Sequence, residues 1–391
     1  MIRIGTRHNL LYPLTFSIFN GLRKIFSILI KKYYNFSGST LLTFIMLFSD
    51  FISGLIIYLR HKKYSKEKLS KKFMGIELIQ APTEIKPADS KIQMIFLIIF
   101  LAYIDFVESI FSSYYIPDQF SVSKSLEMRL KSIIICVSGA FSFFVLEIPI
   151  FKHQILSIII ILICLLVTIS TEMVEFYRDH NKSKGLRYII FIIFLFIINQ
   201  TFTSGCDIIE KYLLEYDFIN PFKLLMLEGA IGMFFCLLFT IHQDPFEQLK
   251  IIRKENPEYI PYLIICIFIF FLFSCGRNIY RIISNKLYSP TSKALFDYIF
   301  VPFFIINYFL LDNDFTINGK RIYYCFIINL IMSFIIVICC LIYNEFIVLF
   351  FCNLEYNTHY EVSKRAKLIQ SKAFELSVNE SYNDSTFNEQ D

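Results

Sequence analysis

Apolar residues in this chain form long blocks, whereas the amphipathic helices of soluble proteins show one-sided stripes. A helix of about 20 apolar residues matches the hydrocarbon core of a bilayer, where a helix satisfies its own backbone polar groups. The pattern predicts an all-α, polytopic membrane protein with about ten transmembrane helices. The predicted spans are residues 9–31, 39–59, 92–113, 131–151, 154–176, 187–209, 222–241, 260–281, 291–311 and 322–343.

Basic residues between the spans predict the orientation of the chain. The segment 60–91 holds nine Lys and Arg residues and reads as a cytoplasmic loop under the positive-inside rule. Ten spans then place both termini in the cytoplasm, in agreement with Arg3 and Arg7 near the start. A basic stretch at 178–187, between the fifth and sixth spans, argues the other way. The tail 346–391 is expected to be cytoplasmic and largely disordered, because its end is rich in Ser, Asn and Glu.

Composition agrees with a membrane location. The 391 residues are 55% hydrophobic and 18% charged, which is unusually apolar for a soluble chain. The formal charge of +5 is explained by loop lysines, and no basic stripe with stacking aromatics indicates nucleic acid binding. The metal-binding, nucleotide-binding and nucleophile motifs of common enzyme families do not occur. We therefore expect neither an enzyme nor a bound metal or cofactor.

Ionisable residues inside the apolar blocks are the main candidates for function. Charges in hydrocarbon are costly and normally face the interior of a helix bundle or a water-filled cavity. Such residues either pair to fix helix register or line a cavity for a solute, and for the whole set we favour a cavity. The mid-span amides of Asn199 and Gln200 have the same two interpretations. The ionisable residues are Asp50, Asp105, Glu108, Asp207, Glu228, Arg277 and Asp297, with Arg129, Arg281 and Lys293 near span ends.

The two halves of the chain show a weak internal symmetry. An acid lies in a Met- and Leu-rich block in both the second span (Asp50) and the seventh (Glu228). A basic residue opens both the fourth span (Arg129) and the ninth (Lys293). Both pairs are five spans apart, and two halves with five crossings each have opposite orientation in the membrane. The spacing predicts inverted five-helix repeats at 1–176 and 177–345, an arrangement common in secondary carriers.

Two ordered motif sets resemble a known family. The first runs Glu210-Lys211, Pro221, Lys223 and then Glu228-Gly229-x-x-Gly232, and the second is Lys286, Ser289, Thr291, Lys293 and Asp297. In this order and spacing they resemble the drug/metabolite transporter superfamily, in its solute carrier family 35 subfamily F (nucleotide-sugar-transporter-like, EamA-like) branch. The chain departs from that pattern at Lys293, where Arg is usual, and at Asp50, where Glu is usual.

The resemblance implies a ten-helix, inverted-repeat carrier with a central cavity that opens alternately to each side. The candidate residues for solute binding or coupling are Asp50, Asp105, Arg129, Gln200, Glu210, Glu228, Arg277, Asn278, Lys293 and Asp297. In this prediction Arg129, Lys293 and Arg277 attract anionic or polar groups, and the acids balance charge or couple protons.

We therefore expect a secondary-active transporter of a small organic solute, such as a nucleotide sugar, another metabolite or a drug-like molecule. Coupled protons or an exchanged solute would supply the driving force, and a homodimer is left open. The protein would lie in an endomembrane or the plasma membrane. The alternative is a non-transporting receptor or scaffold, in which the Lys-rich loop and the polar tail recruit partners and the intramembrane acids are dispensable.

Overall fold

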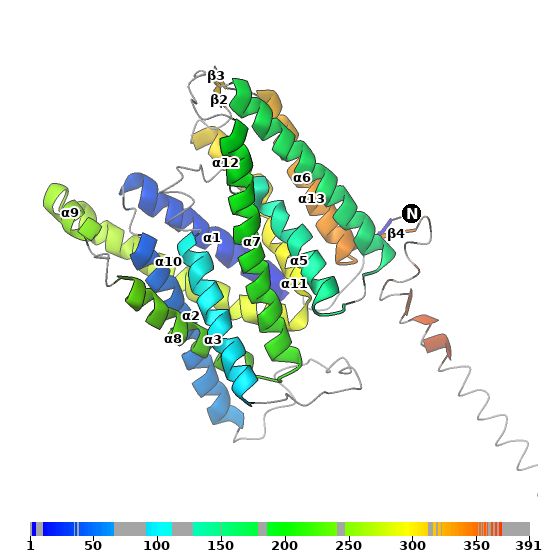
Figure 1. The fold of residues 1–391 in the computed structure, drawn as a ribbon, viewed down its shortest axis with the longest axis horizontal. Coiled ribbons are helices and arrows are strands. Elements are labelled where there is room, and N and C mark those ends of the chain that lie inside the picture. The colour runs from blue at the N-terminus through cyan, green and yellow to red at the C-terminus, as the bar shows by residue number, and fades with distance from the viewer. Residues whose placement is uncertain are drawn as a thin grey trace, which may run out of the picture.

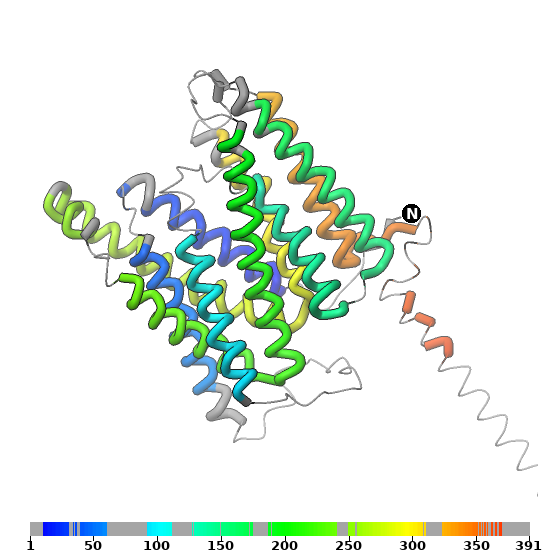
Figure 2. Tube along the Cα trace, viewed as in Figure 1, coloured from blue at the N-terminus to red at the C-terminus, as the bar shows by residue number. Residues whose placement is uncertain are grey.

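The computed structural model describes most of the helical part of the chain (Figure 2). The described residues are 2–4, 11–34, 36, 39–65, 91–111, 127, 129–148, 150–178, 186–240, 247–311, 316–317, 320–321 and 323–350, with 352, 354, 356, 358, 361–362, 364–365 and 367–369. Most of the Lys-rich segment 60–91 and the polar end of the tail lie outside them.

The described elements are nearly all helices (Figure 1). In chain order they are β1 (Ile2–Ile4), α1 (Leu11–Tyr33), α2 (Ser39–Ser65), α3 (Lys91–Ile110), the 3-10 helix η2 (Leu130–Ser132), α5 (Ile133–Phe144), α6 (Lys152–Arg178), α7 (Leu186–Glu215), α8 (Pro221–Thr240), α9 (Glu247–Glu255), α10 (Tyr259–Leu287), α11 (Pro290–Tyr298), α12 (Val301–Leu311), β2 (Thr316–Ile317), β3 (Lys320–Arg321), α13 (Tyr323–Tyr343) and β4 (Ile347–Leu349).

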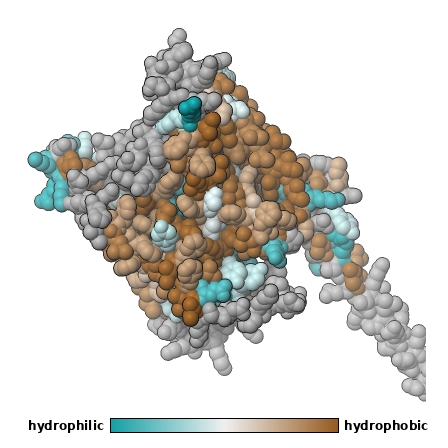
Figure 3. All heavy atoms as spheres, in the orientation of Figure 1, coloured by the Kyte–Doolittle hydropathy of each residue, from teal (hydrophilic) through white to brown (hydrophobic). Residues whose placement is uncertain are grey.

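Eight of the described helices are long and apolar enough to cross a membrane: α1, α2, α3, α6, α7, α8, α10 and α13. Their outward faces carry large apolar side chains, for example Phe96 of α3, Ile163 of α6 and Phe194 of α7, each more than half exposed. Figure 3 shows hydrophobic residues across the face that α3, α6 and α7 form. A soluble protein rarely exposes an apolar area of this extent, so the helical architecture suits a multi-pass membrane protein.

Two predicted spans differ from the structure. In place of one ninth span at 291–311 there are two short helices, α11 and α12, which are interrupted at residues 299–300. Pro302 explains the interruption, because proline lacks the N–H that would bond to the carbonyl of residue 298. The predicted fourth span, 131–151, is also shorter: η2 leads into α5, which ends at Phe144, ahead of Glu147 with a left-handed φ of 52°. Single long helices are therefore wrong at these two places.

The helices pack mainly against partners far away in sequence. The most extensive contacts join α2 to α8, α1 to α10 and α6 to α13. Further contacts join α3 to α7 and α8, α10 to α2, α5 to α7, and α11 to α1 and α5. The small strands β1 and β4 pair antiparallel, with Ile2 opposite Leu349, so the start of the chain lies beside the segment that follows α13. This pairing, the hairpin of β2 and β3, and the short helix α9 have no counterpart among the predicted elements.

Glycines set the closest helix contact. A Cβ added to Gly54 of α2 would lie 2.5 Å from the backbone nitrogen of Met226 in α8. A Cβ on Gly229 of α8 would likewise lie 2.4 Å from the backbone nitrogen of Phe51 in α2. The two backbones can touch at this crossing only because both positions lack a side chain, as in other membrane helix pairs with small residues at the interface.

Candidate functional site

Polar and charged side chains gather inside the bundle, where a soluble protein has its apolar core. Buried carboxyl, amide, amine and guanidinium groups come from α2, α7, α8, α10 and α11. Buried ionic groups are costly unless they are paired, and in membrane proteins they face protein or an aqueous path. Five of the helices that cross or enter the bundle therefore contribute to one polar interior.

Arg281 of α10 lies at the centre of this interior. Its Nη2 is 2.9 Å from Glu228 Oε2, 3.7 Å from Glu210 Oε1 and 4.0 Å from Asp50 Oδ1. The four side chains come from α10, α8, α7 and α2, and all are buried. We call these residues, Asp50, Glu210, Glu228 and Arg281, the Arg281 cluster. Three carboxyl groups around one guanidinium leave two negative charges uncompensated when all three are ionised.

The hydrogen bonds of the Arg281 cluster are incomplete among the described residues. Glu228 accepts from Arg281 at 2.9 Å, and the amide of Asn285 donates to Glu210 Oε2 at 2.6 Å. The other carboxyl oxygen of each glutamate, and Oδ1 of Asp50, are buried with no hydrogen-bond partner in the described part of the chain. These oxygens are available to accept a proton or a donor group from another molecule.

A second ion pair joins α7 to α11 next to the cluster. Lys293 Nζ bonds to Asp207 Oδ1, and both side chains are buried. The backbone carbonyl of Asp207 also accepts from Asn285, at 2.8 Å, which links the pair to Glu210. Lys293, predicted to attract an anionic group of the solute, thus already has a carboxylate partner in this state.

One turn before Arg281, Arg277 and Asn278 connect α10 to α2. Arg277 Nη1 donates to Asn278 Oδ1 at 2.9 Å, and Asn278 Nδ2 donates to Ser49 Oγ at 2.8 Å. Asn278 and Ser49 are fully buried. Both predicted residues therefore contribute to the contact between the two helices, one residue away from Asp50.

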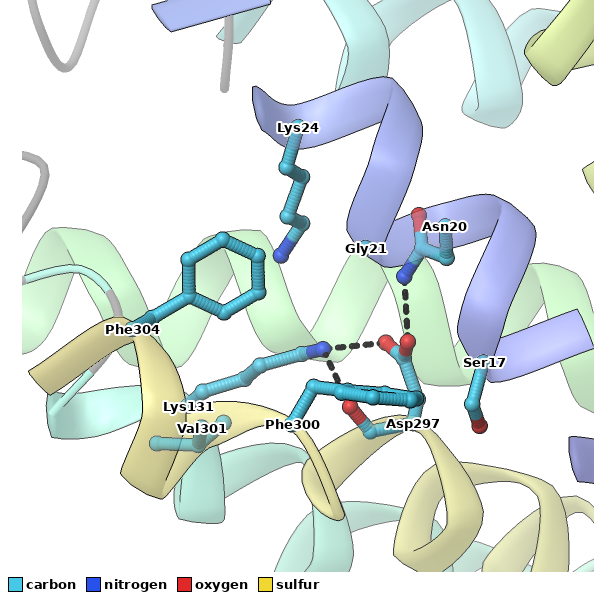
Figure 4. Close-up of a pocket in the computed structure, with 9 residues that line it drawn as sticks. All are labelled: Ser17, Asn20, Gly21, Lys24, Lys131, Asp297, Phe300, Val301 and Phe304. Carbon is cyan, nitrogen blue, oxygen red and sulfur yellow. Dashed lines mark hydrogen bonds and ion pairs between the residues drawn. The ribbon is translucent and has the colours of Figure 1, made fainter. Parts of the chain in front are cut away.

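A small pocket opens beside Asp297, the last predicted site residue (Figure 4). Lys131 Nζ bonds to Asp297 Oδ2 and, at 3.0 Å, to the backbone carbonyl of the same residue. Asn20 Nδ2 donates to Asp297 Oδ1, and Lys24 extends toward the same space from α1. We call this space the Lys24 pocket. Its lining residues are Ser17, Asn20, Gly21, Lys24, Lys131, Asp297, Phe300, Val301 and Phe304.

The structure distributes the predicted residues unequally. Asp50, Glu210 and Glu228 meet at Arg281, whereas Lys293 and Asp297 pair separately. Asp105 on α3 is half-buried and acts on the cluster electrostatically, with no hydrogen bond or ion pair to any residue that the structure describes. Gln200 is buried on α7, and Arg129 is buried directly before η2. The ten predicted residues therefore do not form a single site.

Sequence reasoning missed several residues or gave them too small a role. Arg281 was named among the ionisable residues near span ends but not among the candidate site residues, because it stands at the end of the predicted eighth span; α10 continues to Leu287, so the side chain lies more than one turn inside the helix. Lys131 and Asn20 were not selected, because one opens an apolar block and the other is an uncharged amide within one. A usable signal existed for Lys24: two adjacent cations in the first apolar block require buried partners or access to water.

Buried carboxyl, amine and guanidinium groups of this kind can bind polar or charged groups and can take up or release protons. Among the residues that the structure describes, no three His, Cys, Asp or Glu side chains are placed to hold a metal ion. The chain matches no model of a known protein family, and no curated protein sequence matches it.

Proposed function

We propose that this chain is a secondary-active transporter that carries a small organic solute by alternating access, with the architecture of the drug/metabolite transporter superfamily. The observation that carries the proposal is the Arg281 cluster: three buried carboxyl groups from three helices share one guanidinium within a bundle of apolar helices. Fixing helix register needs only balanced pairs, such as Lys293 with Asp207. Uncompensated acids are suited to a group that changes its charge or its occupant during a cycle.

The cluster has a natural place in such a cycle. Asp50 belongs to the proposed first half of the chain, and Glu210, Glu228 and Arg281 to the second. When the halves rock against each other, the distance from Arg281 to Asp50 changes, while its bond to Glu228 within one half persists. When Arg281 moves away from Asp50, a proton or a cationic group of the solute would take its place at the Asp50 carboxylate. This exchange couples the charge of the cluster to the side of the membrane toward which the cavity opens.

Helix packing supports the two inverted halves of this proposal. An offset of five spans matches α1 with α7, α2 with α8, α3 with α10, α5 with the α11 and α12 pair, and α6 with α13. If each helix is replaced by its match, the contact of α1 with α10 corresponds to that of α7 with α3, and both are present. The contact of α2 with α10 likewise corresponds to that of α8 with α3, and both are present. The contact of α5 with α7 becomes that of α11 with α1, and α2 with α8 and α6 with α13 map onto themselves.

The crossing of α2 and α8 supports the same symmetry at the level of residues. Gly54 approaches the backbone of Phe222 and Met226, and Gly229 approaches that of Leu47 and Phe51. One constant sequence offset relates Gly54 to Gly229, Phe51 to Met226 and Leu47 to Phe222. By that offset Glu228 corresponds to Ser53. The acids Asp50 and Glu228 therefore lie near each other at the crossing of α2 and α8, but they do not occupy equivalent positions of the two proposed repeats.

Transport by purified protein tests the proposal. A thermal-shift screen against nucleotide sugars, nucleotides, amino acids and amphiphilic drugs first selects a solute, because a ligand that binds the folded state stabilises it. Proteoliposomes loaded with that solute should then show uptake that saturates and falls at least tenfold in Glu228→Gln. The exposed Glu258→Gln, at the start of α10, removes an acid outside the cluster and should leave uptake unchanged.

The alternative of a receptor or scaffold predicts a different result. Glu228→Gln would then have no effect on function, and no solute of the panel would enter the vesicles. A folded protein that neither binds nor moves any member of the panel would favour this alternative, and the Lys-rich loop would become the first place to look for a protein partner.

A further inference from the structure

The Arg281 cluster keeps its excess of negative charge when the ionic groups around it are counted. Lys293 pairs with Asp207 and Lys211 with Glu215, so neither lysine supplies a charge to the cluster. Around the cluster lie two acids of α3, a cation of α1, and a cation and a neutral thiol of α10: Asp105, Glu108, Arg23, Arg277 and Cys275. Their charges cancel, so two negative charges remain among these described residues when every acid is ionised.

A net charge of this size needs compensation inside an apolar bundle. A buried carboxylate that lacks a partner takes up a proton, because its ionised form is far less stable away from water. All three acids of the cluster approach the same atom, Arg281 Nη2, at 2.9, 3.7 and 4.0 Å. The guanidinium therefore already occupies the point where a metal ion or an ammonium group would contact all three acids, whereas a proton needs no such space.

We propose that the Arg281 cluster binds a transported proton and that Asp50 is the residue that carries it. This inference rests on the transport function proposed above and names the coupling ion of the same site. A proton gradient across the membrane then supplies the driving force for the solute.

The contacts of the three acids single out Asp50 as the carrier. Glu228 accepts a hydrogen bond from Arg281 at 2.9 Å, and Glu210 accepts one from Asn285 at 2.6 Å. Asp50 lies 4.0 Å from Arg281, beyond hydrogen-bond distance, and its Oδ1 has no hydrogen-bond partner in the described part of the chain. Its negative charge is therefore the least stabilised of the three.

Access to water points to the same residue. The side chain of Asp50 is 6% exposed, whereas those of Glu210 and Glu228 are 0% exposed. A proton that crosses the membrane must arrive from water on one side and leave to water on the other. Asp50 is the acid of the cluster that a water molecule can reach in this state.

The position of Asp50 also lets its proton follow the transport cycle. It is the member of the cluster that belongs to the proposed first half of the chain, and its 4.0 Å distance from Arg281 lies between a bonded pair and a separated one. A modest movement of the halves closes or opens that contact. Arg281 bonded to Asp50 favours the carboxylate and releases the proton to water, and Arg281 held by Glu228 alone leaves Asp50 protonated.

Infrared spectroscopy of the purified full-length protein, near neutral pH in detergent, tests where the proton lies. A protonated carboxyl group has a carbonyl stretch that a carboxylate lacks. We expect this band in the unaltered protein and in Asp50→Glu, which keeps a group that binds a proton, and its loss or reduction in Asp50→Asn. Asp217→Asn, in the turn between α7 and α8, changes an acid outside the cluster and should leave the band unchanged.

Thermal denaturation of the same samples separates proton binding from folding damage. Asparagine resembles the protonated acid in shape and charge, so Asp50→Asn should be as stable as the unaltered protein. A stable Asp50→Asn with the full band of the unaltered protein overturns the assignment of the proton to Asp50. So does a band that disappears in Glu210→Gln or Glu228→Gln and persists in Asp50→Asn, because the proton then lies on a glutamate.

Proteoliposomes test the coupling, with the solute selected by the thermal-shift screen and a pH gradient imposed in each direction in turn. With one proton moved per solute, a gradient of about one pH unit can drive accumulation up to about tenfold. We expect one direction of the gradient to raise uptake by the unaltered protein and by Asp217→Asn. In Asp50→Asn the ratio of uptake with and without the gradient should fall to about one, whatever the absolute uptake.

The outcomes of this experiment distinguish the coupling from the transport function. Saturable uptake by the unaltered protein that ignores the pH gradient rejects proton coupling and leaves the transport function in place. Entry of no solute at all rejects the transport function and the coupling with it.

Discussion

Arg281 is the residue on which the buried acids depend. It is the only cation within 4.0 Å of Asp50, Glu210 and Glu228 among the described residues, and each acid comes from a different helix. Removing one partner of a buried ion pair is far more costly than replacing the whole pair, since the remaining charge stays in a low-dielectric interior. The stability of the bundle and the proposed coupling of charge to transport therefore both depend on the side chain of Arg281.

We expect Arg281→Ala to lower the free energy of unfolding by about 3–5 kcal/mol, because it removes the cation that lies within 4.0 Å of three buried carboxyl groups. Arg281→Lys should be less destabilising than Arg281→Ala, because lysine keeps the positive charge but lacks the several planar N–H donors of the guanidinium group. Thermal denaturation of the purified protein measures both. The exposed Arg253 of α9 provides the matched control, and a loss in Arg253→Ala as large as in Arg281→Ala would contradict the assignment.

The pair of Lys293 and Asp207 should behave as a unit. Lys293→Met and Asp207→Leu should each cost several kcal/mol, whereas the double variant should cost at least 1 kcal/mol less than their sum. A double-mutant cycle of unfolding free energies measures this coupling. Additive effects would mean that the two side chains are stabilised independently, by other neighbours or by water.

At the scale of the elements, the crossing of α2 and α8 is limited by backbone contact. We expect Gly54→Ala or Gly229→Ala to cost about 1–3 kcal/mol, since the new methyl group meets the backbone of the partner helix at 2.5 or 2.4 Å. Gly205 of α7 gives the control, because an added Cβ there meets nothing within 4 Å. Thermal denaturation should show Gly205→Ala unchanged or slightly stabilised. Equal losses in all three variants would indicate a general intolerance of glycine replacement.

Local sequence predicts the helices better than it predicts their partners. Apolar blocks and buried acids such as Asp50 and Glu228 can be recognised because hydrocarbon penalises any charge regardless of what surrounds it. The bond of Lys131 to Asp297 joins positions far apart in the chain, so it depends on how helices pack and leaves no local pattern. The block 291–311 is long and mostly apolar enough to read as one span, so the interruption at 299–300 is not evident; only Pro302 within it signals a break.

At the scale of the whole molecule, the pairing of β1 with β4 brings the start of the chain to the segment after α13. Residues 2–4 and 347–349 therefore lie side by side, an arrangement that fits an even number of membrane crossings between them. Epitope tags at residue 1 and after residue 391 should be accessible from the same side, the cytoplasm, when the plasma membrane alone is permeabilised and the protein is examined by antibody labelling. Tags accessible from opposite sides would mean an odd number of crossings.

The packing of α1 against α10 also has a consequence for synthesis. A ribosome completes α1, with Arg23 and Lys24, long before it adds residues 259–287, the main packing partner of α1, or Asp297 in the Lys24 pocket. Until then the two cations have no acid from this pocket beside them, and each disfavours the lipid interior by about 2.5–3.5 kcal/mol at a helix centre. We therefore expect the nascent α1 to stay at the membrane surface or inside the insertion machinery, and to take its final place only after the second half of the chain has been made.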